Sequence, residues 1–111
     1  MLFVDYLGPA DLFVATRDAV RERVAVVFRT RPEQVVVRRL VAESDYEGVE
    51  VWIEISSDDQ LYRYGARLAE EVSAAIRAHH EVDVWVLFRT VPLERAFLNG
   101  RPRRRHSPPL E

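Results

Sequence analysis

Arginine is the side chain with the clearest chemical potential in this sequence. All 16 basic residues other than histidine are arginines, and neither lysine nor cysteine occurs. Lysine Schiff bases, phosphate-loop lysines, cysteine nucleophiles, disulfides and thiolate metal sites are therefore excluded. Arg38 and Arg39 stand in the middle of a valine-rich run, and a guanidinium there can bind a carboxylate through two parallel hydrogen bonds. The favoured alternative is that one of them faces solvent and the other pairs with Glu50 or Glu54 of a neighbouring strand.

Three further side chains are candidates for such a carboxylate pocket or for a subunit contact. Arg17 lies on a predicted helix from which it could reach the pocket, although a solvated helix face is the favoured interpretation. Trp52 and Trp85 alternate with valines on their strands, and the same faces carry Glu54 and Arg89. A monomer would expose both indoles, so Trp85 is expected to anchor a subunit interface, with a place in the pocket as the alternative.

Metal, nucleic-acid and cofactor sites are not expected. His79 and His80 are adjacent near the end of a predicted helix, so their side chains point about 100° apart and cannot easily share one ion. Four arginines between residues 101 and 105 could contact nucleic acid, but the net charge of the whole chain is −2 and no aromatic residue lies among them. Nothing in the sequence resembles a glycine-rich phosphate loop, a serine triad or a paired-carboxylate catalytic site, and no cofactor is expected.

The elements that must position these residues follow the order strand, helix, strand, repeated once and ended by a hairpin. The strands are expected at residues 2–7, 34–43, 49–56 and 82–89, and the helices at 9–28 and from 57 onward. Pro32 should end the first helix, because the residue before a proline is driven out of the helical region. Ser57 and Gln60 match a capping box for the second helix, and Asn99-Gly100 is a strong turn signal.

Two βαβ units in tandem predict an α+β domain with a four-stranded mixed sheet, two helices on one face and a C-terminal hairpin. A ferredoxin-like fold, whose strands are all antiparallel, shares the element order and is the alternative. Residues 1–100 are expected to form a single domain, and residues 101–111 a disordered tail rich in arginine and proline. No apolar run approaches the roughly 20 residues of a membrane span, and the first residues lack the features of a secretory signal, so the expected location is the cytoplasm.

Two segments resemble a known family. Residues 48–55 (GVEVWIEI) and 81–100 (EVDVWVLFRTVPLERAFLNG) are similar to parts of an uncharacterised group of short bacterial tautomerase-like proteins, and the likeness spans roughly residues 1 to 101. In the tautomerase superfamily, two βαβ halves form one mixed sheet with both helices on one face. The resemblance implies proton transfer between carbon and oxygen of an α-keto acid by an amino-terminal proline. It also implies arginines on the substrate carboxylate, and trimers or hexamers with the site at a subunit boundary.

Position 2 departs from the family's pattern. Leu2 follows Met1 where the family has its proline, and methionine is normally removed only before small residues. The chain is therefore expected to keep Met1 and to lack the classical proline-dependent activity. The favoured function is a tautomerase-like homotrimer without the catalytic proline, which binds a small acidic ligand or serves a role without catalysis. The alternatives are an isomerase that uses the Met1 amine or another base with Arg38 or Arg39, and a ferredoxin-like interaction or regulatory module.

Overall fold

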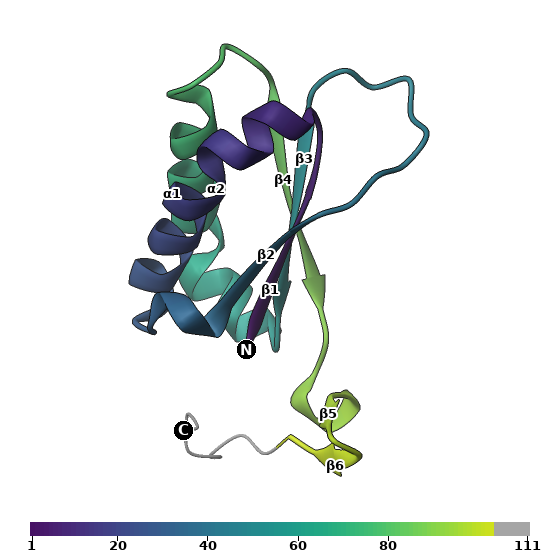
Figure 1. Cartoon of the computed structure of the whole chain (residues 1–111). Helices are drawn as coiled ribbons and strands as arrows, with labels where there is room; N and C mark the ends of the chain where they lie inside the picture. The colour runs from purple at the N-terminus through teal and green to yellow at the C-terminus, as the bar shows by residue number, and fades with distance from the viewer. Residues whose placement is uncertain (104–111) are drawn as a thin grey trace.

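Two helices lie side by side on one face of a four-stranded sheet (Figure 1). The structure is a computed structural model, and it describes residues 1–103. The elements follow the predicted order: β1 (Leu2–Leu7), α1 (Ala10–Phe28), β2 (Val35–Arg39), β3 (Val49–Ile55), α2 (Asp58–Arg77) and β4 (Val84–Thr90). Short turns of 3₁₀ helix, η1 (Pro32–Gln34) and η2 (Leu93–Arg95), precede β2 and follow β4.

The sheet has the strand order β2-β1-β3-β4. Within each βαβ half the two strands are parallel and adjacent: β1 pairs with β2, and β3 pairs with β4. The halves join through the antiparallel pair β1 and β3. This mixed arrangement confirms the predicted α+β class and excludes the ferredoxin-like alternative, which requires every neighbouring pair to be antiparallel.

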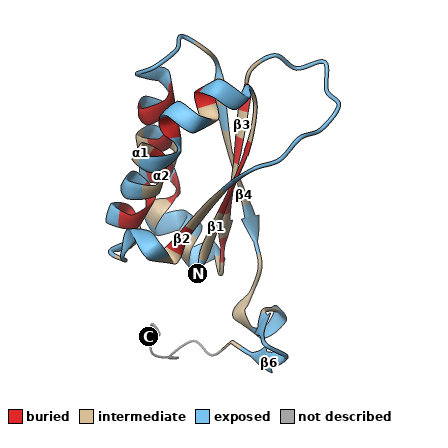
Figure 2. Cartoon of the chain, in the orientation of Figure 1, coloured by how far each residue is buried: buried red, intermediate tan, exposed pale blue. Residues whose placement is uncertain are grey.

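The hydrophobic core lies between the helices and the sheet (Figure 2). Strand β3 alternates as predicted, because successive side chains of a strand point to opposite faces. Its core face consists of Val49, Val51, Ile53 and Ile55, all buried. The helices supply the matching apolar stripes, with Val20, Val24, Val27, Leu68, Val72 and Ile76 buried. Within residues 1–103 no helix covers the other face of the sheet, which we call the open face.

The first helix ends at Phe28, as its apolar stripe predicts, but Pro32 is not what ends it. Arg29 adopts the left-handed conformation at φ 55°, and its N–H bonds back to the helix. Thr30 N–H then donates to Ala25 O at 2.9 Å, so the terminal carbonyls are satisfied before the chain turns away. Pro32 is therefore not the residue that ends the helix, and it opens the turn η1 instead.

Strand β2 is shorter than the predicted 34–43. Among the described strands it pairs with β1 alone, which ends at Leu7, and the bond from Leu40 N–H to Tyr6 O (2.8 Å) lies at the end of the paired region. Beyond it the chain leaves the sheet and crosses to β3 as an irregular segment. Val41, predicted within the strand, is consequently 80% exposed.

The predicted cap and turn signals are confirmed. Gln60 N–H donates to Ser57 Oγ at 3.2 Å, while the Gln60 side chain accepts from Ser56 N–H at 2.8 Å, one residue earlier than in the usual capping box. Asn99 and Gly100 both have positive φ and join two short strands, β5 (Phe97–Leu98) and β6 (Arg101–Pro102). The start of the predicted tail therefore belongs to a hairpin, and the prediction for residues 104–111 lies outside the described residues.

Candidate functional site

A buried carboxylate occupies the middle of the open face. Strand β1 directs Val4 and Tyr6 towards the helices, so the alternation of side chains places Asp5 on the opposite face. Its side chain is only 3% exposed. A buried ionised carboxylate is costly unless it is paired and hydrogen-bonded. Asp5 must therefore find partners on the neighbouring strands.

Two arginines supply those partners. Arg38 lies directly across from Asp5 in the parallel pair, and its Nε and Nη2 donate to Oδ1 and Oδ2 at 2.5 and 3.2 Å. Arg89 reaches across from β4 and donates from Nη2 to Oδ2 at 2.9 Å. The same nitrogen also donates to Glu54 Oε2 at 3.2 Å. Each of the four strands thus contributes one charged side chain to what we call the Asp5 cluster: Asp5, Arg38, Glu54 and Arg89.

The cluster holds the pKa of the Asp5 carboxyl below its usual value of 3.8. The hydrogen bond from Arg38 is the largest cause, burial opposes it, and Arg89 adds to the lowering. The pKa of Arg38 is raised by the same hydrogen bond. Asp5 is therefore an anion over the whole neutral range and cannot act as a general base poised near pH 7.

Aromatic rings support both guanidinium groups. The Arg38 guanidinium carbon lies 4.8 Å from the centre of the Phe3 ring, and that of Arg89 lies 5.7 Å from the Trp52 ring. Trp52 Nε1–H in turn donates to Glu50 Oε1 at 3.3 Å. These contacts restrict both arginines to positions over the open face.

The Asp5 cluster retains some capacity to bind. Its two carboxylates and two guanidinium groups cancel in formal charge, yet the side chains of Arg38 and Arg89 remain 46% and 44% exposed. Within residues 1–103, no hydrogen bond uses Nη1 of Arg38, or Nη1 and Nε of Arg89. These N–H groups can donate to a further acceptor at the open face.

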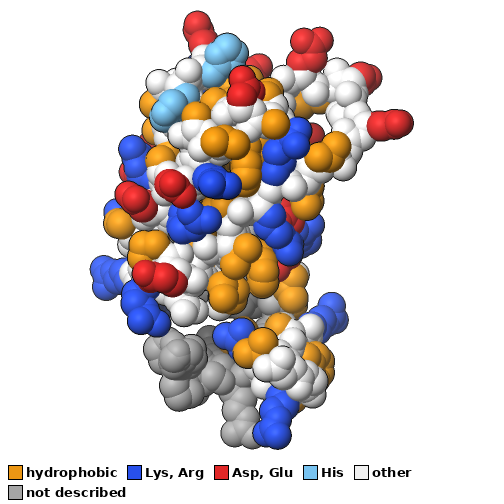
Figure 3. Space-filling model, in the orientation of Figure 1, with side chains coloured by type: hydrophobic (Ala, Val, Ile, Leu, Met, Phe, Trp, Pro, Cys, Tyr) orange, Lys and Arg blue, Asp and Glu red, His pale blue; other side chains and the backbone are white. Residues whose placement is uncertain are grey.

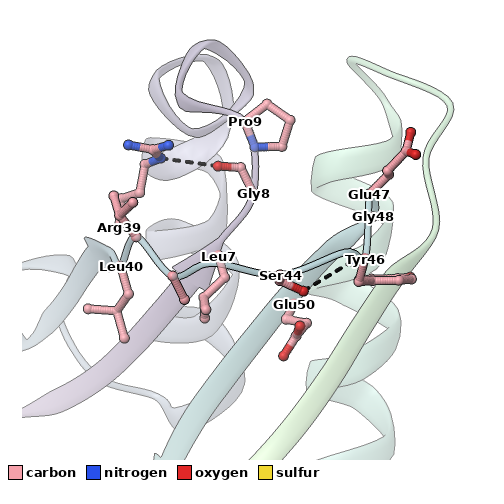
Figure 4. A pocket seen from close by; sticks show the side chains of 12 residues that line it. Leu7, Gly8, Pro9, Arg39, Leu40, Ser44, Tyr46, Glu47, Gly48 and Glu50 are labelled. Carbon is pink, nitrogen blue, oxygen red and sulfur yellow. Dashed lines mark hydrogen bonds between the residues drawn. The ribbon is translucent and has the colours of Figure 1, made fainter.

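Arg38 and Arg39 do not share a site. Arg39 points the other way, and its Nε donates to Gly8 O at 3.1 Å at the far end of β1 (Figure 4). There it lines a cavity of about 340 Å³ beneath the segment that joins β2 to β3. The expectation that one of the two arginines pairs with Glu50 or Glu54 is not met by their hydrogen bonds, because Arg38 binds Asp5 directly opposite it and Arg39 binds Gly8 O.

The remaining candidates are dispersed. Arg17 lies on α1, in the layer on the other side of the sheet, 6.0 Å from the centre of the Phe13 ring. Trp85, at the start of β4, is 59% exposed and borders a cavity of about 330 Å³ next to α2. Met1 and Leu2 lie at the start of β1, at the opposite end from the Arg39 cavity. The structure therefore brings none of these together with Arg38.

Sequence reasoning missed the two residues that complete the cluster. Asp5 carried a signal, because a carboxylate inside the otherwise apolar run LFVDYL must either be exposed or have a cationic partner. For Arg89 the sequence contained no signal beyond its place on a strand, since its contact with Asp5 depends on the order of strands in the sheet.

The described residues contain no group of three or more histidine, aspartate or glutamate side chains that could hold a metal ion. In the same part of the chain, neither helix is long and apolar enough to cross a membrane.

Comparison with known proteins shows the fold. No protein-family model matches the sequence, and no curated protein matches it. A domain of unknown function from Sebaldella termitidis has a TM-score of 0.76 over 92% of this chain and 99% of its own, at 7% identity. A macrophage migration inhibitory factor-like protein from Entamoeba histolytica gives 0.72 over 91% and 97%, at 5% identity. A fused 4-OT symmetric trimer gives 0.66 over 92% and 94%, at 14% identity. The chain has the tautomerase fold.

Replacing Asp5 tests the cluster. Asp5→Asn keeps the shape but removes the anion between two arginines, and since both remain partly hydrated we expect a loss of about 2–3 kcal/mol in the free energy of unfolding, measured in urea. Glu54→Gln, at the partly exposed rim, should cost less than about 1 kcal/mol.

The pH dependence of that loss follows from the lowered pKa of Asp5. A lowered pKa in the folded state means that the unfolded chain takes up the proton first as the pH falls, so the stabilisation is lost in acid. The difference between the wild type and Asp5→Asn should therefore shrink from about pH 5 to pH 2. A difference that stays constant over this range contradicts an ionised Asp5.

Proposed function

We propose that this protein is a tautomerase-superfamily protein without the proline catalyst, and that it works as a homotrimer assembled through the open face of its sheet. The proposal rests on one observation: α1 and α2 cover a single face of the sheet, and no helix within residues 1–103 covers the open face (Figure 1). A sheet is normally packed on at least one further layer wherever its face is apolar.

The composition of the open face supports an interface. Apolar side chains surround the Asp5 cluster and are only partly buried in the single chain: Phe3, Leu7, Val36, Trp52 and Leu87. Such a patch with a polar, hydrogen-bonded centre is typical of a surface that contacts protein. The fused 4-OT symmetric trimer, which shares the fold, supports three as the number of copies.

The N-terminus supports a role without classical catalysis. Leu2 provides no ring nitrogen at the head of β1, where the resemblance places the superfamily's proline. The side chain of Asp5, on the same strand, is already paired with Arg38 and Arg89. We therefore propose that the protein binds a ligand without turning it over.

The proposed ligand is a small carboxylate held by Arg38 and Arg89 at the subunit boundary that the open face forms. Both guanidinium groups have N–H donors left over from the cluster, and both lie over aromatic rings that would contact the ligand's carbon atoms. Because the cluster is neutral in formal charge, it provides no excess positive potential, and we expect affinity in the millimolar range, about −4 kcal/mol.

Sedimentation velocity tests the assembly. The wild type should sediment at about three times its chain mass of 12.9 kDa. Leu87→Glu places a charge on the open face and should shift the protein to monomers. Val26→Glu, on the solvent face of α1 where Val26 is 64% exposed, is the matched control and should leave the trimer intact. A wild-type monomer at all concentrations contradicts the proposal.

A keto–enol assay tests the absence of catalysis. With phenylpyruvate we expect no ketonisation above the buffer rate, and mass spectrometry of the purified protein should find Met1 retained. The control is the same assay after acetylation of the α-amine. Turnover that disappears on acetylation would instead establish an isomerase that uses the Met1 amine.

Indole fluorescence tests the ligand. In a Trp85→Phe background, Trp52 beneath Arg89 reports binding at the open face. Pyruvate should quench it saturably, and Arg89→Gln should weaken binding about tenfold, since a hydrogen bond to a charged group contributes about 1.5–3 kcal/mol. Arg39→Gln, remote from the cluster, should have no effect. Equal quenching by neutral acetamide counts against recognition of a carboxylate.

A further inference from the structure

The hairpin that follows β4 carries apolar and basic side chains away from the rest of the molecule (Figure 1). We call residues 93–103 the hairpin arm. Phe97 and Leu98 are 62% and 58% exposed. Its hydrogen bonds run within the arm and its base, from Arg95 N–H to Pro92 O, from Ala96 N–H to Leu93 O and from Arg103 N–H to Ala96 O. The arm therefore has a defined shape and offers a surface at Phe97 and Leu98 that residues 1–103 leave exposed.

The charges of the hairpin arm are predominantly positive. It contains Arg95, Arg101 and Arg103 against Glu94 alone. An apolar tip surrounded by arginines requires a partner with apolar side chains and carboxylates.

The segment between β2 and β3 has that complementary composition. We call residues 40–48 the acidic segment. It carries three exposed carboxylates, Glu43, Asp45 and Glu47, and no basic residue. It also exposes apolar side chains, with Val41 at 80% and Leu40 at 41%. Figure 3 shows acidic side chains gathered over this segment and basic side chains on the hairpin arm at the other end of the molecule.

A cavity lies under the acidic segment (Figure 4). Its volume of about 340 Å³ exceeds that of one aromatic side chain. Leu7, Leu40, Val41 and Tyr46 form its apolar lining. Arg39 is the one basic residue of the lining, and its Nε is already bound to Gly8 O.

The hairpin arm cannot reach the acidic segment of its own chain. The segment leads into β3, the arm follows β4, and these two strands are parallel. The two features therefore lie at opposite ends of strands of seven residues, about 20 Å apart. Complementary surfaces at opposite ends of one molecule can meet only between copies, head to tail.

We propose that the hairpin arm of one copy docks on the acidic segment of the next, with Phe97 entering the cavity and Arg101 and Arg103 facing the carboxylates. Such a heterologous contact closes into a ring when the rotation between copies divides a full turn. The proposal rests on the proposed trimer and names the surfaces that join its neighbours, in addition to the open faces.

Sedimentation velocity of arm and segment variants tests the contact. Phe97→Ser should weaken association at least about tenfold, since an aromatic anchor in a pocket dominates such interfaces. Arg101→Glu with Arg103→Glu, and separately Glu43→Arg with Glu47→Arg, should each weaken it, and a chain with all four reversals should recover. Tyr62→Ser, on α2 where Tyr62 is 83% exposed, is the control for loss of an exposed aromatic residue.

A mixing experiment tests the direction of the contact. The Phe97→Ser chain keeps a working acidic segment, and a chain with Glu43→Arg and Glu47→Arg keeps a working arm. Mixed, they have one functional arm contact between them and should associate more tightly than either variant does alone.

The outcomes separate the two proposals. A wild-type trimer that Phe97→Ser and the charge reversals leave unchanged overturns head-to-tail docking and leaves the trimer standing. A wild-type monomer overturns the trimer itself. Arm variants that dissociate the trimer without recovery by the combined reversal contradict the pairing of these two surfaces, while leaving the arm in an interface.

Discussion

The arrangement of the four strands depends on the buried carboxylate of Asp5, which needs cationic partners from the other strands. Asp5 is held in place by Arg38 from one neighbouring strand and by Arg89 from the far edge, and Arg89 is itself held by Glu54. Because side chains alternate along a strand, a slip of β2 or β4 by one residue would turn its arginine to the core face and leave Asp5 without that partner. The cluster thus fixes the register of four strands, while the apolar face determines which side the helices cover.

The two faces of the sheet differ in composition. One face packs on the hydrophobic core, with Val4, Val49 and Ile53 wholly buried. The other combines half-buried aromatic rings with charges that satisfy one another, so it can lie against protein without leaving an unpaired charge. A similar separation exists along the strands, where acidic and basic surfaces lie at opposite ends. The hydrophobic core, the Asp5 cluster and the two charged ends therefore occupy different parts of one small domain.

Local sequence patterns predicted the helices and strands well. They could not predict contacts between residues that are distant in the sequence. The alternation from Val49 to Ile55 and the turn at Asn99-Gly100 each depend on a few neighbouring residues. The end of β2 does not, because Leu40 and Val41 after Arg39 favour a strand whether or not β1 continues beside them. Asp5 lies 33 residues from Arg38 and 84 from Arg89, so its partners are determined by strand order. The cost of burying an unpaired carboxylate could identify Asp5 as a residue that needs a cationic partner. Which arginines are its partners depends on the strand order.

The strand order also has a consequence for how the chain folds. In each half a single helix connects the two parallel strands. The halves are joined in the sheet by one set of strand hydrogen bonds, between β1 and β3. Two of the three strand pairs are therefore parallel and need a helical crossover before they can form, which makes them slower to form than a hairpin. The exposed residues that connect the halves contribute no ladder bond beyond Leu40. New chain termini placed there would leave both halves whole, which makes this connection the natural point for circular permutation.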